Sequence, residues 1–89
     1  MKAIFDPQYN LVLQKLIFAR KNSGRTQKEL ANCLGKPQSF VSKYENRERR
    51  LDVVEFVLIC HLLLIEPCSV VTELVESLEV SGVFERLSS

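Results

Sequence analysis

The stretch that decides the fold is TQKELANCLGKPQSFVSKYEN, residues 26–46. It predicts two short helices joined at a glycine. Thr26 and Glu29 have the spacing of a capping box, in which each side chain accepts a hydrogen bond from the other residue's backbone N–H. Gly35 stands where the first helix ends in left-handed backbone. Pro37 opens the second helix, where a missing backbone N–H costs nothing.

The second helix, about residues 38–46, has two unlike faces. Val41 and Tyr44 point inward at helical spacing. The opposite face carries polar side chains, namely Gln38, Ser39, Ser42 and Lys43. Such side chains can read base edges in the major groove of DNA, although a solvated helix face is the plainer alternative. The pair is therefore predicted to be a helix-turn-helix, with these four residues as base contacts of the recognition helix.

Phe40 does not share the face of Val41 and Tyr44, so we expect a large apolar side chain to be exposed beside the reading face. It could then contact the DNA backbone sugar or a thymine methyl group. A partial core or interface position is the alternative.

A resemblance to a known family rests on these residues and their spacing. The stretch resembles the phage repressor and Cro-like helix-turn-helix family, also called the xenobiotic-response-element family. The matching residues are Arg20, Thr26, Gln27, Glu29, Leu30, Ala31, Leu34, Gly35, Gln38, Ser39, Val41, Ser42, Lys43 and Glu45. The match continues through residues 49–52 and covers about residues 11–66. Asn46 stands where many relatives have Gly, and Asn tolerates left-handed backbone nearly as well.

This resemblance implies a compact, all-α, lambda-repressor-like domain of five helices with a central helix-turn-helix and a short C-terminal extension. It also implies that Gln27 contacts the DNA backbone. It joins Arg20, on the first helix, to Glu45, at the end of the recognition helix. A bidentate, partly buried pair of this kind would fix the recognition helix against the rest of the domain.

The net charge of +1 hides two unlike halves. Residues 20–50 hold nine Lys and Arg against three Glu, and residues 51–89 hold one Arg against seven acids. The basic half suits DNA phosphates, whereas the acidic half would be repelled by them. The predicted DNA backbone contacts are Gln27, Lys28, Lys36, Phe40, Asn46, Arg47, Arg49 and Arg50. For any one of these cations, a purely solubilising role is the alternative.

The remaining helices follow from start signals and apolar periodicity. Asp6-Pro7 predicts a first helix to Asn22 after a loose arm of residues 1–6. Asp52 and Glu55 predict a second capping box, which opens an apolar fourth helix to about residue 64 that should be buried on more than one side. A fifth helix should run from residue 67 to about residue 78, and residues 79–89 could form a short strand or another helical turn.

We expect residues 1–89 to form a single domain, with its core in residues 7–66. The fifth helix and tail, residues 67–89, carry more apolar surface than so small a core can enclose, which predicts a homodimer interface. The residues expected there are Val71, Leu74, Val75, Leu78, Val83 and Phe84. The alternative is that the tail folds back over its own domain.

Several classes of function have no support in the sequence. The three cysteines (Cys33, Cys60 and Cys68) lack metal-binding spacing and are predicted to be small core residues. His61 is predicted to be a core or interface histidine rather than a metal ligand. There is no nucleophile–base set, no cofactor motif and no apolar run long enough to span a membrane, so we expect a cytoplasmic protein that is not an enzyme.

The function predicted is sequence-specific binding of double-stranded DNA by a transcriptional regulator, a repressor acting as a homodimer on an inverted repeat. The rival prediction is an antitoxin or interaction module that uses the same fold to bind a toxin or another protein.

Overall fold

We describe the chain from a computed structural model, which covers residues 6–88 of the backbone and the side chains from Pro7. It consists of α1 (Asp6–Asn22), α2 (Gln27–Leu34), α3 (Gln38–Glu45), α4 (Val53–Leu62), α5 (Pro67–Val80) and α6 (Val83–Ser88). The described residues contain no strand, which confirms the all-α prediction. The predicted arm falls mostly on residues 1–5, outside the described residues. The tail forms a sixth, short helix, as one of its two alternatives anticipated.

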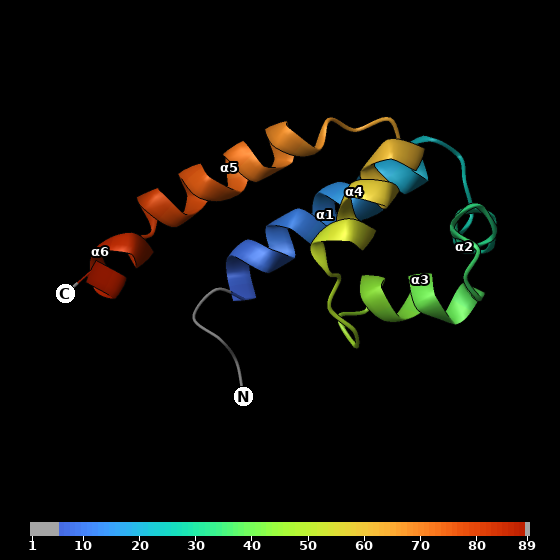
Figure 1. Cartoon of the computed structure of the whole chain (residues 1–89), viewed down its shortest axis with the longest axis horizontal. Helices are drawn as coiled ribbons and strands as arrows, with labels where there is room; N and C mark the ends of the chain where they lie inside the picture. The colour runs from blue at the N-terminus through green and yellow to red at the C-terminus, as the bar shows by residue number, and fades with distance from the viewer. Residues whose placement is uncertain (1–5, 89) are drawn as a thin grey trace.

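The helices form an elongated body measuring 45 × 28 × 20 Å. Figure 1 shows α2 and α3 at one end, α1 and α4 in the middle, and α6 at the opposite end. α5 packs against α1 and α4 and then carries α6 away from the helix-turn-helix. The basic and acidic halves of the sequence therefore lie toward opposite ends of the molecule.

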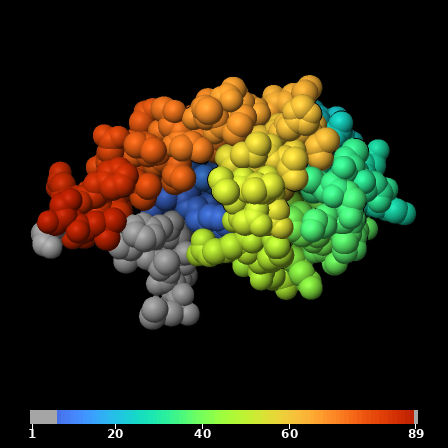
Figure 2. All heavy atoms as spheres, viewed as in Figure 1, coloured from blue at the N-terminus to red at the C-terminus, as the bar shows by residue number. Residues whose placement is uncertain are grey.

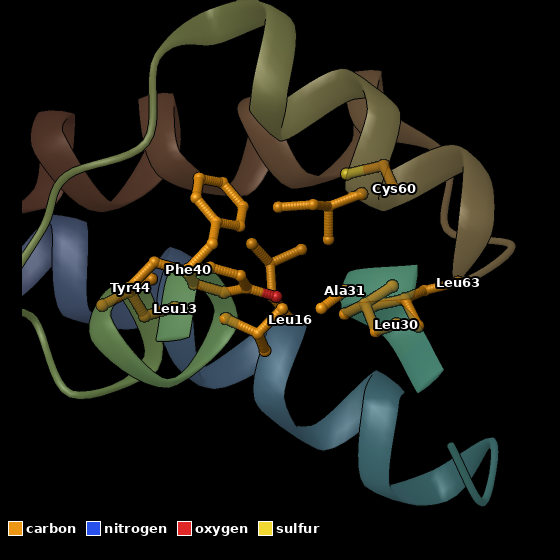
Figure 3. Close-up of a cluster of buried hydrophobic side chains, with 10 residues drawn as sticks. Leu13, Leu16, Leu30, Ala31, Phe40, Tyr44, Cys60 and Leu63 are labelled. Atoms are coloured by element: carbon orange, nitrogen blue, oxygen red, sulfur yellow. The ribbon is translucent and has the colours of Figure 1, made fainter. Parts of the chain in front are cut away.

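The core lies where the first four helices meet (Figure 3). Its buried side chains are Leu13, Leu16, Leu30, Ala31, Phe40, Val41, Tyr44, Ile59, Cys60 and Leu63. The inward positions predicted for Val41 and Tyr44 are confirmed, since neither side chain is exposed to solvent. The recognition helix is thus one wall of the core, and its orientation depends on core packing.

Both predicted capping boxes are present. The Thr26 hydroxyl accepts from the Glu29 N–H at 3.1 Å, and the Glu29 carboxylate accepts from the Thr26 N–H at 2.9 Å. Asp52 and Glu55 make the same reciprocal bonds at 2.7 and 2.9 Å. These bonds satisfy N–H groups that the first turn of a helix leaves without a partner.

The ends of the helices contain one confirmation and one correction. Gly35 ends α2 with φ 68°, as predicted. Asn46, expected in left-handed backbone, has φ −86°, and Arg47 takes the left-handed conformation with φ 63°. The reversal occurs one residue later because the Asn46 N–H still bonds the Ser42 carbonyl at 3.0 Å and continues the helical pattern. α4 ends at Leu62 rather than at about residue 64, and Leu64 takes the left-handed conformation with φ 58°.

Two side chains predicted to be buried lie at the surface. Cys33 and Cys68 are exposed, and of the three cysteines Cys60 alone is a core residue. His61 is exposed as well, which excludes the core position and leaves its predicted interface position untested. α4 packs against both α2 and α5. Its apolar surface is not enclosed all round, however, because one of its faces stays exposed within the chain and carries Val53, Val54, Val57 and Leu58.

One residue expected at a dimer interface is buried within the chain. Val83, the first residue of α6, is 1% exposed, and α6 packs against α5. Val83 is therefore removed from the predicted interface. Val71, Val75 and Phe84 remain exposed, and Leu74 and Leu78 are half-buried.

Candidate nucleic-acid interface

The polar face of α3 is presented to solvent as the sequence predicts. Gln38, Ser39 and Lys43 are exposed and Ser42 is half-buried, all on one helix. The opposite face of the helix is completely buried through Val41 and Tyr44. A rigidly seated helix with hydrogen-bonding side chains on its outer face has the form needed to enter a major groove.

The predicted pair of Arg20 and Glu45 is present and bidentate. Arg20 Nε donates to Glu45 Oε2 at 2.7 Å, and Arg20 Nη2 donates to Glu45 Oε1 at 3.1 Å. The two side chains are 10% and 6% exposed. The hydrogen bond that Arg20 donates to Glu45 raises the pKa of Arg20. It joins α1 to the C-terminal end of the recognition helix.

Glu45 also binds α2. Gln27 Nε2 donates to Glu45 Oε1 at 2.9 Å, so one carboxylate holds α1, α2 and α3 together. The sequence predicted Gln27 at the DNA backbone. Its amide nitrogen carries a second N–H, so this internal bond still leaves a donor for a phosphate oxygen. The bond itself was not foreseen, because residues 27 and 45 lie on different helices.

Phe40 is not exposed, contrary to the expectation. Its side chain is 8% exposed and belongs to the core. It lies one turn before Tyr44 on the same face of α3, and its ring stands edge-to-face against that of Tyr44 with centroids 5.7 Å apart. We therefore withdraw Phe40 as a DNA backbone contact and accept the core alternative.

Two cations cover the outer side of the Phe40 ring. Lys36 Nζ lies 5.5 Å from the ring centroid, and Arg49 Cζ lies 4.8 Å from it. Both distances fall in the range of cation–π attraction. Lys36 belongs to the turn before α3 and Arg49 to the loop after it, so both connections of the recognition helix meet at this ring.

Arg49 is also held in an ion pair. Its Nη1 and Nη2 donate to the two carboxylate oxygens of Glu55, each at 2.8 Å. Glu55 is the acid of the second capping box, and its hydrogen bond from Arg49 lowers the pKa of Glu55. The sequence predicted Arg49 as a DNA backbone contact, and in the structure it is exposed and forms this ion pair at the start of α4.

The other predicted backbone contacts lie around the reading face. Lys28, Lys36, Asn46, Arg47 and Arg50 are exposed. Arg47 Nη1 donates to Asn10 Oδ1 at 3.5 Å, and Arg50 Cζ lies 4.4 Å from the centroid of the Tyr9 ring. These contacts tie the loop after α3 to α1 while its cations stay at the surface.

Neither a metal-binding cluster nor a membrane-spanning helix is found among the described residues. They contain no group of three or more His, Cys, Asp or Glu side chains arranged to hold a metal ion. Among them, no helix has both the length and the apolar character that crossing a membrane requires.

Comparison with known proteins agrees with this geometry. A helix-turn-helix family profile matches residues 16–68, more than half of the chain. The fold is similar to a solved structure, an XRE-family like protein from Pseudomonas syringae pv. tomato str. DC3000, with a TM-score of 0.78 and 47% sequence identity. That match covers 83% of this chain and 90% of the other. No curated protein matches the chain. By its helix-turn-helix match and this relative, the chain belongs to the XRE family of helix-turn-helix proteins, whose fold is that of DNA-binding transcription regulators.

Proposed function

We propose that this protein is a sequence-specific repressor of transcription that binds an inverted-repeat operator as a homodimer. The observation that carries the proposal is the recognition helix itself. Its outer face bears Gln38, Ser39 and Lys43, while Glu45 at its end is fixed by Arg20. Side chains on a helix held in this way can be aligned with base edges.

The proposed base contacts follow from side-chain chemistry. The Gln38 amide can pair with adenine, the Lys43 ammonium can reach the acceptor atoms of guanine, and Ser39 and Ser42 can bond either base. The proposed DNA backbone contacts surround them, namely Gln27, Lys28, Lys36, Asn46, Arg47 and Arg50. Arg49 is left out because both of its terminal nitrogens already bond the Glu55 carboxylate.

A homodimer would supply the contact area that one small domain lacks. A single helix-turn-helix buries little surface on DNA, so such domains usually bind as pairs on related half-sites. The chain has apolar surface for this purpose. A groove of about 280 Å³ is lined mainly by α1, the start of α4 and α5. Its lining includes Val53 on α4 and Val71 and Leu74 on α5, so apolar side chains of both helices meet at this groove.

A second candidate function uses that region for another protein. An antitoxin or interaction module would cover the same groove with a toxin or another partner. The exposed valines of α4 favour this candidate as much as they favour a homodimer. The basic surface around α3 favours the DNA-binding proposal, because a pure interaction module has no need of it.

The test is selection of the full-length protein on random duplexes at about 0.1 M salt, a concentration at which phosphate contacts still contribute to affinity. We expect a palindromic sequence to be enriched. Gln38→Ala and Lys43→Ala should each cost about 1–3 kcal/mol at one base position and relax the preference there.

Lys28→Ala is the matched control for a phosphate contact. It should weaken binding to all duplexes alike and reduce the slope of log affinity against log salt by about 0.9. Enrichment of no sequence would contradict DNA recognition and leave the interaction module as the better account.

A further inference from the structure

The two ends of the recognition helix are held differently. At its C-terminal end, Glu45 is bonded to Arg20 and Gln27. At its N-terminal end, Pro37 is the N-cap and, within the described residues, makes no side-chain capping bond. Gln38 and Ser39, two of the four proposed base contacts, lie in this first turn. Another interaction must therefore fix the end of the helix that reads DNA.

Phe40 is the residue of that turn that enters the core. It is the third residue of α3 and is 8% exposed, and its backbone N–H bonds the Pro37 carbonyl at 3.0 Å. The Phe40 ring packs edge-to-face against the Tyr44 ring. The place of the Phe40 ring therefore determines where the first turn of α3 lies.

Arg49 is the most constrained group on the outer side of that ring. Its guanidinium lies 4.8 Å from the Phe40 centroid and is held by two 2.8 Å bonds to Glu55. Its Nη1 also donates to the Arg50 carbonyl at 3.1 Å. Glu55 in turn is fixed by the Asp52 N–H at 2.9 Å, as part of the box that starts α4. An unbroken series of contacts thus runs from the start of α4 to the first turn of α3.

We propose that Arg49 is a positioning residue, which aligns the base-reading end of α3 through Phe40 and does not serve as a phosphate contact. The inference rests on the proposed DNA-binding function and concerns how specificity is achieved. A guanidinium can stack on a ring and bond a carboxylate in the same plane, whereas an ammonium cannot do both. The pair with Glu55 also reduces the net attraction that Arg49 can exert on a phosphate.

Three variants separate the two roles. Arg49→Ala removes the side chain, and Arg49→Lys keeps its charge but loses the planar fork. Glu55→Gln releases Arg49 while retaining an acceptor for the capping box, since Gln serves as well as Glu at that position. If Arg49 contacted a phosphate, Arg49→Lys would bind DNA about as well as the wild-type protein. Glu55→Gln would then bind DNA as well or better, because Glu55 would no longer compete for Arg49.

The measurement is binding of each full-length variant to the selected duplex over about 0.05–0.2 M salt, with Lys28→Ala as the phosphate control. We expect Arg49→Lys and Glu55→Gln each to weaken binding about tenfold, the loss typical of one misaligned base contact, with the salt slope unchanged. Discrimination against a duplex with one changed base pair should fall as well. Lys28→Ala should instead lower the slope by about 0.9 and keep that discrimination.

Two results would overturn the proposal. One is a slope lowered by about 0.9 in Arg49→Ala. The other is wild-type affinity in Arg49→Lys. Thermal unfolding by circular dichroism sets a temperature at which each variant is folded, and the two conservative variants remain informative if Arg49→Ala does not fold.

Failure of the proposed function would look different, because the wild-type protein would then bind no duplex. The positioning role is still measurable in that case by NMR. Phe40 ring resonances that shift in both Arg49→Lys and Glu55→Gln, but not in Lys28→Ala, would support it. Ring resonances that stay in place would overturn it.

Discussion

Glu45 is the single residue on which most of the site geometry depends. Its two oxygens accept three hydrogen bonds, from Arg20 on α1 and Gln27 on α2, and its side chain is 6% exposed. A buried ion pair adds little net stability compared with an apolar pair, but loss of one partner leaves an uncompensated charge. The pair therefore matters chiefly for the placement of α3.

Substitution of Arg20 by Ala should lower the free energy of unfolding by about 3–5 kcal/mol, because Glu45 is left buried without its partner. Lys21→Ala is the control on the same helix, where an exposed substitution should change stability by no more than about 0.5 kcal/mol. Urea denaturation of Arg20→Ala, Glu45→Ala and the double variant Arg20→Ala/Glu45→Ala completes a double-mutant cycle. A coupling energy below about 0.5 kcal/mol would contradict the pair.

Tyr44 offers a second prediction at the scale of one residue. Its ring is buried, and its hydroxyl has no hydrogen-bond partner among the described residues. The same burial raises the pKa of Tyr44. A buried hydroxyl without a partner costs about 1–3 kcal/mol, so Tyr44→Phe should leave the midpoint of urea unfolding unchanged or raise it. A loss of more than about 1 kcal/mol would instead indicate a bonded internal water at the hydroxyl.

At the scale of the element, the helix starts should make stability depend on pH. The bonds from Thr26 lower the pKa of Glu29, and the bond from Arg49 followed by that from Asp52 lowers the pKa of Glu55. A carboxyl group with a lowered folded pKa stabilises the protein above its unfolded pKa, about 4.3 for Glu. That contribution is lost as the pH falls through the folded pKa.

Glu55→Gln should therefore flatten the acid side of the stability profile, since Gln keeps the capping acceptor but does not titrate. The measurement is urea unfolding of wild type and variant between about pH 6 and pH 2.5. Glu85→Gln is a matched control on the exposed α6. The expectation is contradicted if Glu55→Gln and wild type lose stability in parallel over that range.

How much of this structure the sequence predicts depends on whether the signal is local. The capping boxes at Thr26 and Asp52 and the left-handed Gly35 are set by residues within one turn, and all were predicted correctly. The pair of Arg20 and Glu45 was anticipated through family resemblance, and the structure contains it. Residue spacing alone would not join two side chains 25 positions apart.

The expectation that Phe40 is exposed misjudged helical periodicity. Phe40 and Tyr44 are four residues apart and lie on the same face of α3, so Phe40 enters the core beside Tyr44. The other errors concern contacts that depend on the tertiary arrangement. The pair of Arg49 with Glu55 was missed because it crosses from a loop into a helix, where no periodic spacing applies. The exposed valines of α4 were misplaced because apolar composition does not reveal which side of a helix another helix covers.

At the scale of the whole molecule, the charges are divided along its length. Residues 20–50 hold nine of the twelve Lys and Arg, and in Figure 2 the segments of α2 and α3 lie at one end while α5 and α6 extend toward the opposite end. On α5, Glu76 and Glu79 are exposed, and Lys15 of α1 forms an ion pair with Glu73. A duplex should therefore approach the end bearing α3, which leaves the far end available for contact with a second copy.

The final prediction concerns that contact. Val71 and Phe84 are 46% and 43% exposed, and Val71 lines the groove that reaches α4. Val71→Glu and Phe84→Glu should each place a charge in the apolar interface of a homodimer, where burial without a partner is strongly unfavourable. By light scattering at micromolar concentration, we expect the wild-type protein to have about twice the 10.2 kDa mass of the chain. Both variants should have a mass close to that of the single chain. Phe18→Glu, which changes an exposed phenylalanine of α1 outside the proposed interface, is the matched control and should remain dimeric.

Val71→Glu and Phe84→Glu should also lose cooperative binding to an inverted repeat whose half-sites are about 34 Å apart, while each variant binds a single half-site as before. A wild-type chain that remains monomeric when saturated with such a duplex would contradict the homodimer and favour a different protein as the occupant of the groove.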